Sequence, residues 1–255
     1  MGRPNLGTDG SERRTNFDAV GETCGRDYSR YAKDLERGAN KLRITIIGDV
    51  HSKTDQYQKM LRQKYEGQRT IQIGDMGIGF SGTPGLHKDI MGENHKWFRG
   101  NHDDPAKCRA SVGYLGDYGF LPEDNLFYIA GAFSIDRIWR IPGVSWWPDE
   151  ELSWTELDAT IELYKEKKPR FVISHEAPQA ASMWLLTVIA GGFRPEKMVQ
   201  TRTGSAMQRM LDYHHPEEWI FGHYHINKTF EFQGVKFTCV DELSTYTISD
   251  EPLIK

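Results

Sequence analysis

The stretch Ile44–His51, which reads ITIIGDVH, decides the fold class. Four aliphatic or β-branched residues run directly into Gly48, a pattern typical of a buried strand in a parallel sheet. The glycine allows a sharp turn where the chain leaves the sheet. Asp49 and His51 would then project from the carboxyl end of the strand, where open α/β sheets place their ligands. A carboxylate and an imidazole two residues apart can reach one metal ion.

The same arrangement recurs along the chain. Four later segments read as strands that end beside polar residues of ligand types: Gln68–Ile73, Lys96–Arg99, Phe171–Ser174 and Glu218–Phe221. A strand, a helix and a second strand of this length imply parallel pairing through a right-handed crossover. The alternation of strands and helices therefore predicts an α/β fold.

Other segments complete the predicted secondary structure. Leu126–Ile129 and Ala132–Ile135 read as two strands joined near Gly131, and Trp154–Lys168 reads as a helix that Pro169 ends. Two further segments, Lys228–Phe232 and Val235–Val240, predict a terminal hairpin that turns at Gln233-Gly234.

The predicted strand ends gather eight residues that bind metals in proteins: Asp49, His51, Asp75, Asn101, His102, His175, His223 and His225. Carboxylate, imidazole and amide oxygen suit Mn, Fe or Zn better than they suit a thiolate-binding metal. Eight such residues exceed the needs of one ion, whereas two ions about 3.5–4 Å apart that share a carboxylate would use them. A single His or Asp is more often structural, but the joint pattern favours a dinuclear metal centre.

These motifs resemble those of a known superfamily. GDVH, the Gly74-Asp75 pair, GNHD, the strand-end His175 and GHYH match in order and approximate spacing the five motifs of the calcineurin-like metallophosphoesterases. The resemblance covers about Leu42–Asp241 and implies a four-layer α/β/β/α sandwich with a dinuclear centre at the strand ends. The stretches GAFSIDR and GVSWWPDEELS further resemble a compact subgroup found in phages and bacteria.

The resemblance also implies a role for each motif residue. It assigns Asp49, His51 and His225 to the first metal, Asn101, His175 and His223 to the second, and Asp75 to the bridge between them. His102 would stabilise the phosphoryl group and protonate the leaving oxygen. A hydroxide activated by both ions would attack phosphorus in line, without a covalent enzyme intermediate. The implied cofactors are two divalent ions, Mn foremost, with Fe, Ni or Zn as alternatives.

One position departs from the family pattern. Many members carry an aspartate three residues after the bridging one, where it orients the catalytic histidine, but this chain has Ile78 there. Asp103, Asp104 or a backbone carbonyl could take that place beside His102. Of these, we predict Asp103 as a catalytic residue. The arginine that follows in protein phosphatases is also missing, which disfavours a phosphoprotein substrate.

Arginines and tryptophans outside the motifs are candidate substrate contacts. Guanidinium groups bind phosphate bidentately, although surface charge explains most arginines. We favour Arg194 and Arg202 over Arg137 and Arg140, because they lie in the long insert between two predicted metal ligands. Trp146 could stack on a planar base. The alternative is that this ring and its neighbour cover the sheet edge as part of the core.

Composition limits the remaining possibilities. The 255 residues are 38% hydrophobic and carry a net charge of −4, which argues against strong bulk attraction to nucleic acid. The three cysteines, Cys24, Cys108 and Cys239, are far apart and predict a reducing, cytoplasmic environment. The sequence has no apolar run of membrane-spanning length and no apolar signal-peptide core near its start, so no membrane partner is expected.

The sequence thus predicts two regions and one activity. Residues 1–41 form a polar, flexible extension, and residues 42–255 form a metallophosphoesterase domain. The activity is metal-dependent hydrolysis of a phosphoester, such as a phosphodiester or a nucleotide-type phosphate. A nuclease that processes nucleic-acid ends is the alternative among enzymes, and a non-catalytic metal-binding scaffold is the alternative from another class. The oligomeric state stays open.

Overall fold

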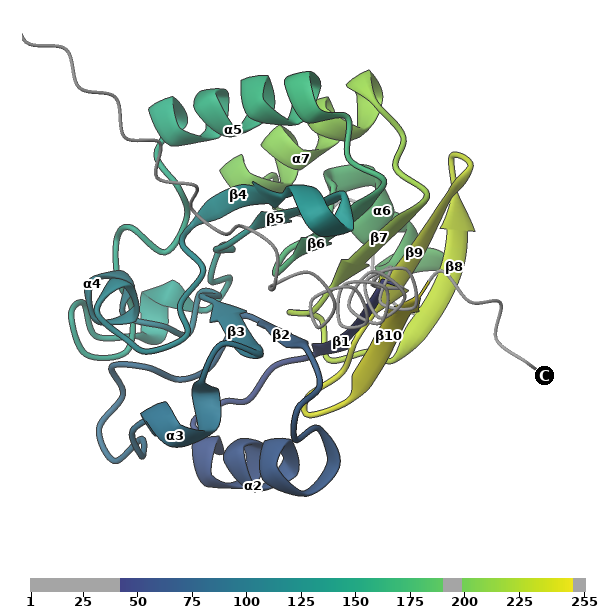
Figure 1. Ribbon diagram of the computed structural model, residues 1–255. Coiled ribbons are helices and arrows are strands. Elements are labelled where there is room, and N and C mark those ends of the chain that lie inside the picture. Colours follow the sequence, from purple (N-terminus) through teal and green to yellow (C-terminus); the bar gives the residue numbers. More distant parts are fainter. Residues whose placement is uncertain (1–41, 190–198, 250–255) are drawn as a thin grey trace, which may run out of the picture. The chain divides into compact units, whose positions relative to one another are not determined.

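The computed structural model describes residues 42–189 and 199–249. The predicted extension, residues 1–41, and the candidate Arg194 lie outside the described residues. Within them, the strands form one four-stranded and one six-stranded sheet (Figure 1).

The first sheet contains the strand predicted from the ITIIGDVH stretch. Its order is β10-β1-β2-β3, with β1 (Arg43–Ile47), β2 (Thr70–Ile73) and β3 (His95–Phe98) parallel to one another. Strand β10 (Thr245–Ser249) pairs antiparallel with β1 at the edge. The parallel pairing that the sequence predicts for the first two strands is therefore confirmed, and β3 extends it.

The second sheet has the order β4-β5-β6-β7-β9-β8. Its strands are β4 (Tyr118–Leu121), β5 (Leu126–Ile129), β6 (Phe171–Ser174), β7 (Glu218–Phe221), β8 (Lys228–Phe232) and β9 (Val235–Cys239). The four inner strands are parallel, whereas β4 and β8 pair antiparallel at the two edges. Ala132–Ile135, predicted as a strand, is instead a loop that follows β5.

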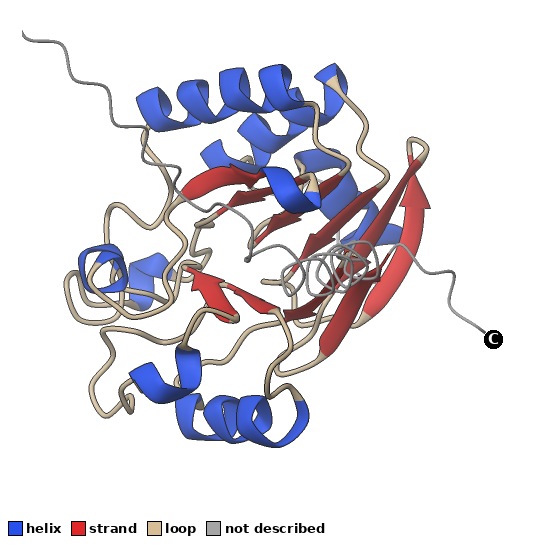
Figure 2. Ribbon diagram, in the orientation of Figure 1, coloured by secondary structure: helices blue, strands red, loops and turns tan. Residues whose placement is uncertain are grey.

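Helices cover the outer face of each sheet (Figure 2). The first sheet is covered by α2 (Thr54–Lys64) and α3 (Lys88–Met91), and the second by α5 (Trp154–Lys167), α6 (Gln179–Trp184) and α7 (Arg202–Tyr213). The remaining helices are α4 (Pro105–Arg109), η1 (Pro122–Asp124), η2 (Arg137–Trp139) and η3 (Leu185–Ile189). The four-layer α/β/β/α sandwich is thus confirmed.

Side-chain alternation along the strands joins these layers. In β1, Ile44 and Ile46 pack between the two sheets against Ile173 and Ile220, whereas Ile47 packs on the side of α2 and α3. Both faces of the strand are therefore buried, which explains its nearly continuous apolar sequence. Among the described helices, none is both long enough and apolar enough to span a bilayer.

Candidate metal centre

The turns that follow β1, β2, β3, β6 and β7 bring the expected ligand residues to one place. A pocket of about 520 Å³ is lined by six of the eight motif residues: His51, Asp75, Asn101, His102, His223 and His225. Asp49 and His175 are buried and contact members of that set. Parallel strands with their carboxyl ends at one edge are what gather residues so distant in the chain.

One cluster consists of Asp49, His51 and His225. The Nε2 atoms of the two histidines lie 2.9 Å apart. Asp49 Oδ2 lies 3.4 Å from His51 Nε2 and 3.1 Å from His225 Nε2. Ligand atoms bound at about 2.1 Å to one ion, at right angles or tetrahedrally, lie about 3.0–3.4 Å from one another. The three donor atoms therefore fit a single metal ion.

A second cluster consists of Asp75, His175 and His223, whose ligand atoms lie within 4.8 Å of one another. His175 Nε2 is 3.2 Å from Asp75 Oδ1 and also 3.2 Å from Asn101 Oδ1. His175 Nδ1 lies 2.8 Å from the carbonyl oxygen of Ile73, which can only accept a hydrogen bond. Nδ1 would therefore keep its proton in the metal-binding form, and Nε2 would present its lone pair to the cluster.

Asn101 and Asp75 supply further oxygen atoms to the two clusters. Asn101 Nδ2 donates to Ser134 Oγ at 3.0 Å, which turns the Asn101 oxygen toward His175. Asp75 lies between the clusters, with Oδ2 3.8 Å from His51 Nε2 and Oδ1 3.2 Å from His175 Nε2. One carboxylate thus faces both sets of donors, as a bridging ligand must.

The electrostatics of the buried groups favour bound cations. Burial opposes ionisation of Asp49, but hydrogen bonds with His225 and His51 hold its pKa at about 2. Burial also opposes charge on His175, yet the Asp75 carboxylate raises its pKa to about 10. Burial lowers the pKa of His223 to about 3, so that imidazole is neutral and has a free lone pair. The carboxylates that draw a proton onto His175 would attract divalent ions in the same way.

The backbone of the site is held in unusual conformations. Four expected ligand residues have φ between 46° and 68°: His51, Asp75, His223 and His225. Such conformations cost about 1 kcal/mol or more each and cluster at functional sites. At Gly100, a Cβ atom would come within 2.2 Å of Asp75 Oδ1 and 2.5 Å of His175 Nε2. The glycine before the Asn-His pair is therefore required by close packing of the ligands.

His102 lies at the side of the pocket beside Arg140. Arg140 Nη2 is 2.6 Å from His102 Nε2, and Arg140 Nε pairs with Asp136 Oδ1 at 2.7 Å. The ring of Phe80 stacks on His102, with centroids 6.1 Å apart. Burial lowers the pKa of His102, and the charge of Arg140 acts in the same direction. The histidine is thus neutral here and accepts a hydrogen bond from the guanidinium.

Asp103 occupies a different position from the one expected of a partner for His102. Its carboxylate is fully buried and accepts hydrogen bonds from four backbone amides, those of Met76, Gly77, Ile78 and Gly100, at 2.7–3.1 Å. Asp104 instead caps α4, with its side chain accepting from two amides of the first turn. Asp103 therefore holds the loop after Asp75 in place, and the expectation that it orients the His102 ring is corrected.

We predict that Asp103→Asn lowers the free energy of unfolding by about 3 kcal/mol, because one amide oxygen cannot serve four N–H donors and the new NH₂ group would face them. Asp104→Asn is the control, with a loss below about 0.5 kcal/mol, since Asn and Asp cap helices equally well. Urea denaturation under identical metal conditions measures both. Equal losses in the two variants would contradict this assignment.

The described residues predicted to contact the substrate do not line the pocket that holds the predicted metal ligands. Trp146 and Arg202 lie outside the pocket lining, and Arg202 Nε pairs with Glu151 at 3.3 Å at the start of α7. Arg140 lines the pocket instead. Sequence reasoning ranked it below Arg194 and Arg202, and its only local signal is the Asp136 four residues earlier, with which it pairs.

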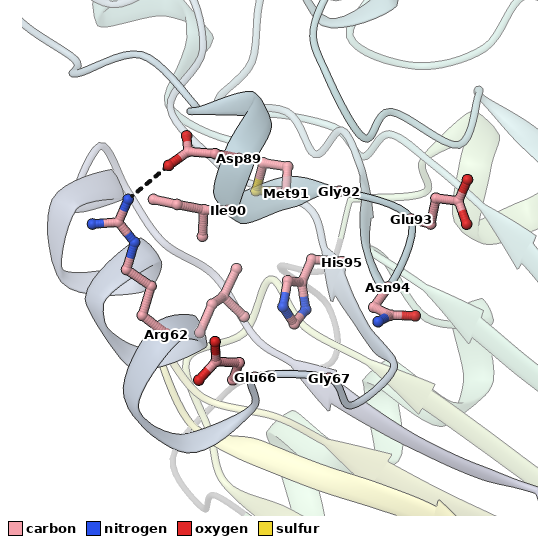
Figure 3. Close-up of a pocket in the computed structure, with 11 residues that line it drawn as sticks. Arg62, Glu66, Gly67, Asp89, Ile90, Met91, Gly92, Glu93, Asn94 and His95 are labelled. Atoms are coloured by element: carbon pink, nitrogen blue, oxygen red, sulfur yellow. Dashed lines mark hydrogen bonds and ion pairs between the residues drawn. The ribbon is translucent and has the colours of Figure 1, made fainter.

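A separate hollow of about 390 Å³ lies between α2, α3 and the start of β3 (Figure 3). An ion pair between Arg62 and Asp89, 3.0 Å long, lies at its edge. Its described lining contains none of the residues predicted for the metal centre. The chemistry of the motifs is therefore concentrated in the pocket at the strand ends.

Comparisons with known proteins identify the family of this chain. The family model for calcineurin-like phosphoesterase matches residues 42–227. Among solved structures, TT1561 of Thermus thermophilus is similar with 11% identity and a TM-score of 0.49, covering 82% of this chain and 99% of that one. The phosphopantetheinyl hydrolase PptH of Mycobacterium tuberculosis is similar with 15% identity and a TM-score of 0.49, covering 85% and 99%. No curated protein sequence matches this chain. The matched region spans most of the sequence, and the chain belongs to the calcineurin-like phosphoesterase family of metal-dependent phosphoester hydrolases.

Proposed function

We propose that this enzyme hydrolyses phosphodiesters with two divalent metal ions. In this proposal the first ion is held by Asp49, His51 and His225, the second by Asn101, His175 and His223, and Asp75 bridges the two. The observation that carries the proposal is the pair of adjoining donor clusters that face one carboxylate. Mn is the proposed metal, and Fe, Ni or Zn would suit the same donors.

The described residues suggest how the reaction proceeds. Two bound ions supply charge neutralisation and lower the pKa of water for attack on phosphorus. Arg140 would donate to the phosphoryl oxygens instead of to His102, and the negative charge of these oxygens would favour the protonated form of His102 beside them. The phosphorus–oxygen bond opposite the attacking water breaks, and His102 gives its proton to the departing alcohol oxygen.

The charge of the pocket favours a diester over other phosphoesters. Among its described lining residues, Arg140 is the one fixed cation, and Asp136 already pairs with it. A diester carries a single negative charge, whereas a monoester carries close to two. A nucleic-acid strand would require several Lys or Arg contacts along its backbone. Beyond the two proposed metal ions the described lining offers one cation, so we favour a phosphate with a single charge and keep a nuclease as the weaker alternative.

The direct test compares bis-p-nitrophenyl phosphate with p-nitrophenyl phosphate, using metal-stripped protein reloaded with Mn. We expect the diester to be hydrolysed with the higher kcat/KM. Cleavage of the monoester alone would overturn the diester assignment. Protein that holds two metals and hydrolyses neither ester would instead support the non-catalytic scaffold.

A second prediction concerns Arg140. Arg140→Met should lower kcat/KM for the diester about 100-fold, because a charged hydrogen bond to the phosphoryl group is lost. Arg137→Met is the matched control three residues earlier in the chain: its guanidinium lies over the Phe133 ring, 4.6 Å from the centroid, and we expect less than about a threefold change. Equal effects of the two substitutions would show that Arg140 acts only through general charge.

A further inference from the structure

The pocket at the strand ends has a second side of different chemistry. Four side chains form what we call the apolar wall: Phe133, Ile135, Leu186 and Val199. The first two belong to the loop between β5 and η2, Leu186 lies in η3, and Val199 lies before α7. These residues line the same cavity as the candidate metal ligands. A molecule bound there would contact both kinds of surface.

The side chains of the apolar wall are unusually exposed for apolar residues grouped beside a polar site. Ile135 is 79% exposed and Val199 is 46% exposed, while Phe133 and Leu186 are half-buried. Exposed apolar side chains grouped around a cavity are typical of ligand-binding surfaces. Covering them with an apolar group would remove their surface from water and stabilise the complex.

Two hydroxyl groups next to the wall, those of Ser134 and Thr201, are already engaged. Ser134 Oγ donates to Glu150 at 2.5 Å, and Thr201 Oγ1 donates to Glu176 at 2.5 Å while accepting from the Gly204 amide at 2.9 Å. An alcohol with many hydroxyl groups, or one with a nucleobase, would give up hydrogen bonds to water without gaining equivalents at the wall. The described wall therefore favours an aliphatic group over a polar one.

We propose that the substrate carries an aliphatic group on its phosphate, and that this group lies against the apolar wall while the phosphoryl group lies among the metal-ligand residues. This inference rests on the proposed phosphodiesterase function, because that function places the phosphorus at the ligand side of the pocket. The apolar wall then selects among phosphoesters by the chemistry of their substituents.

The experiment uses n-alkylphosphonates, which present one phosphoryl group and one chain and are not hydrolysed. Methyl-, propyl- and hexylphosphonate are tested as inhibitors of bis-p-nitrophenyl phosphate hydrolysis by the Mn-loaded full-length protein. We expect the inhibition constant to fall about threefold per added methylene, which is roughly 200-fold from methyl to hexyl. Propylphosphonate should also bind at least about tenfold more tightly than 2,3-dihydroxypropylphosphonate, which has the same carbon chain with two hydroxyl groups.

Variants assign the effect to the apolar wall. Leu186→Ser and Ile135→Ser should each reduce the methyl-to-hexyl ratio about tenfold, because each removes one apolar contact. Ile138→Ser is the matched control: Ile138 is 76% exposed three residues after Ile135 and does not line the pocket. The ratio should be unchanged in that variant.

The outcomes separate this inference from the proposed function. A methyl-to-hexyl ratio below about threefold, or tighter binding of the dihydroxy compound, would overturn the aliphatic assignment even if the diester is hydrolysed. If the diester is not hydrolysed, the proposed function fails, and calorimetric titration with the same phosphonates still measures the chain-length effect. A ratio that falls equally in the Ile138→Ser control would also overturn the assignment to the wall.

Discussion

Replacing Asp75 with Asn should lower kcat about a thousandfold and reduce the bound metal from two ions per chain to at most one. Asp75 is buried, and its two oxygens face His51 at 3.8 Å and His175 at 3.2 Å. An amide keeps the size of the side chain but removes the negative charge that both clusters share. It also replaces one of the two facing oxygens with a nitrogen that cannot bind metal.

The control for this substitution is Asp89→Asn. Asp89 pairs with Arg62 on the helices that cover the first sheet, and its side chain is exposed. We expect its kcat and metal content to match the wild type, as measured by diester hydrolysis and by elemental analysis of the purified protein. An Asp75→Asn protein that keeps two metals and normal kcat would show that Asp75 is not the bridge.

His102→Ala should lower kcat by a factor that depends on the leaving group. For a diester whose leaving group is an alkyl alcohol the loss should be about a thousandfold, because an alkoxide is a poor leaving group without a proton donor. For p-nitrophenolate, which leaves readily as an anion, the loss should be about tenfold. Metal content should remain at two ions per chain, since the proposed ligands are unchanged.

The control is His87→Ala, an exposed histidine at the start of α3. It should leave both rates within about twofold of wild type. Equal losses of His102→Ala activity for the two leaving groups would exclude its role as a general acid. Loss of a metal ion would show instead that His102 is a metal ligand. Its position beside His51 and Asp75 would allow that role.

Much of the fold follows from local sequence pattern. Strands β5, β6 and β7 begin and end where the apolar runs predict, because each run is buried on both faces and bounded by turn residues. The terminal hairpin of β8 and β9 is confirmed as well.

Other strands could not be predicted in this way. Strand β10 lacks a continuous apolar run because it is a partly exposed edge strand, and its pairing with β1 joins residues about 200 positions apart. Ala132–Ile135 has a strand-like sequence, but the chain leaves the sheet at Gly131, where φ is 83°. Ser134 then bonds to Glu150 rather than to a neighbouring strand.

The candidate site also has residues that the sequence predicts and residues that it does not. The motif residues could be found because each lies within four residues of the end of one of five parallel strands, so the sheets place them together. Arg140 and Asp103 act through contacts with the loops after β3 and β2, and no local pattern specifies which side chain will face them. The apolar wall is also formed by segments that meet only in the folded chain.

The most direct test of the dinuclear centre is a titration of metal-stripped protein with Mn²⁺, followed by bis-p-nitrophenyl phosphate hydrolysis. Two donor clusters that both face Asp75 predict that activity rises to a plateau at two ions per chain, with little activity at the first equivalent if binding is sequential. Full activity at one ion per chain, or activity in the stripped protein without added metal, would contradict a mechanism that depends on both clusters.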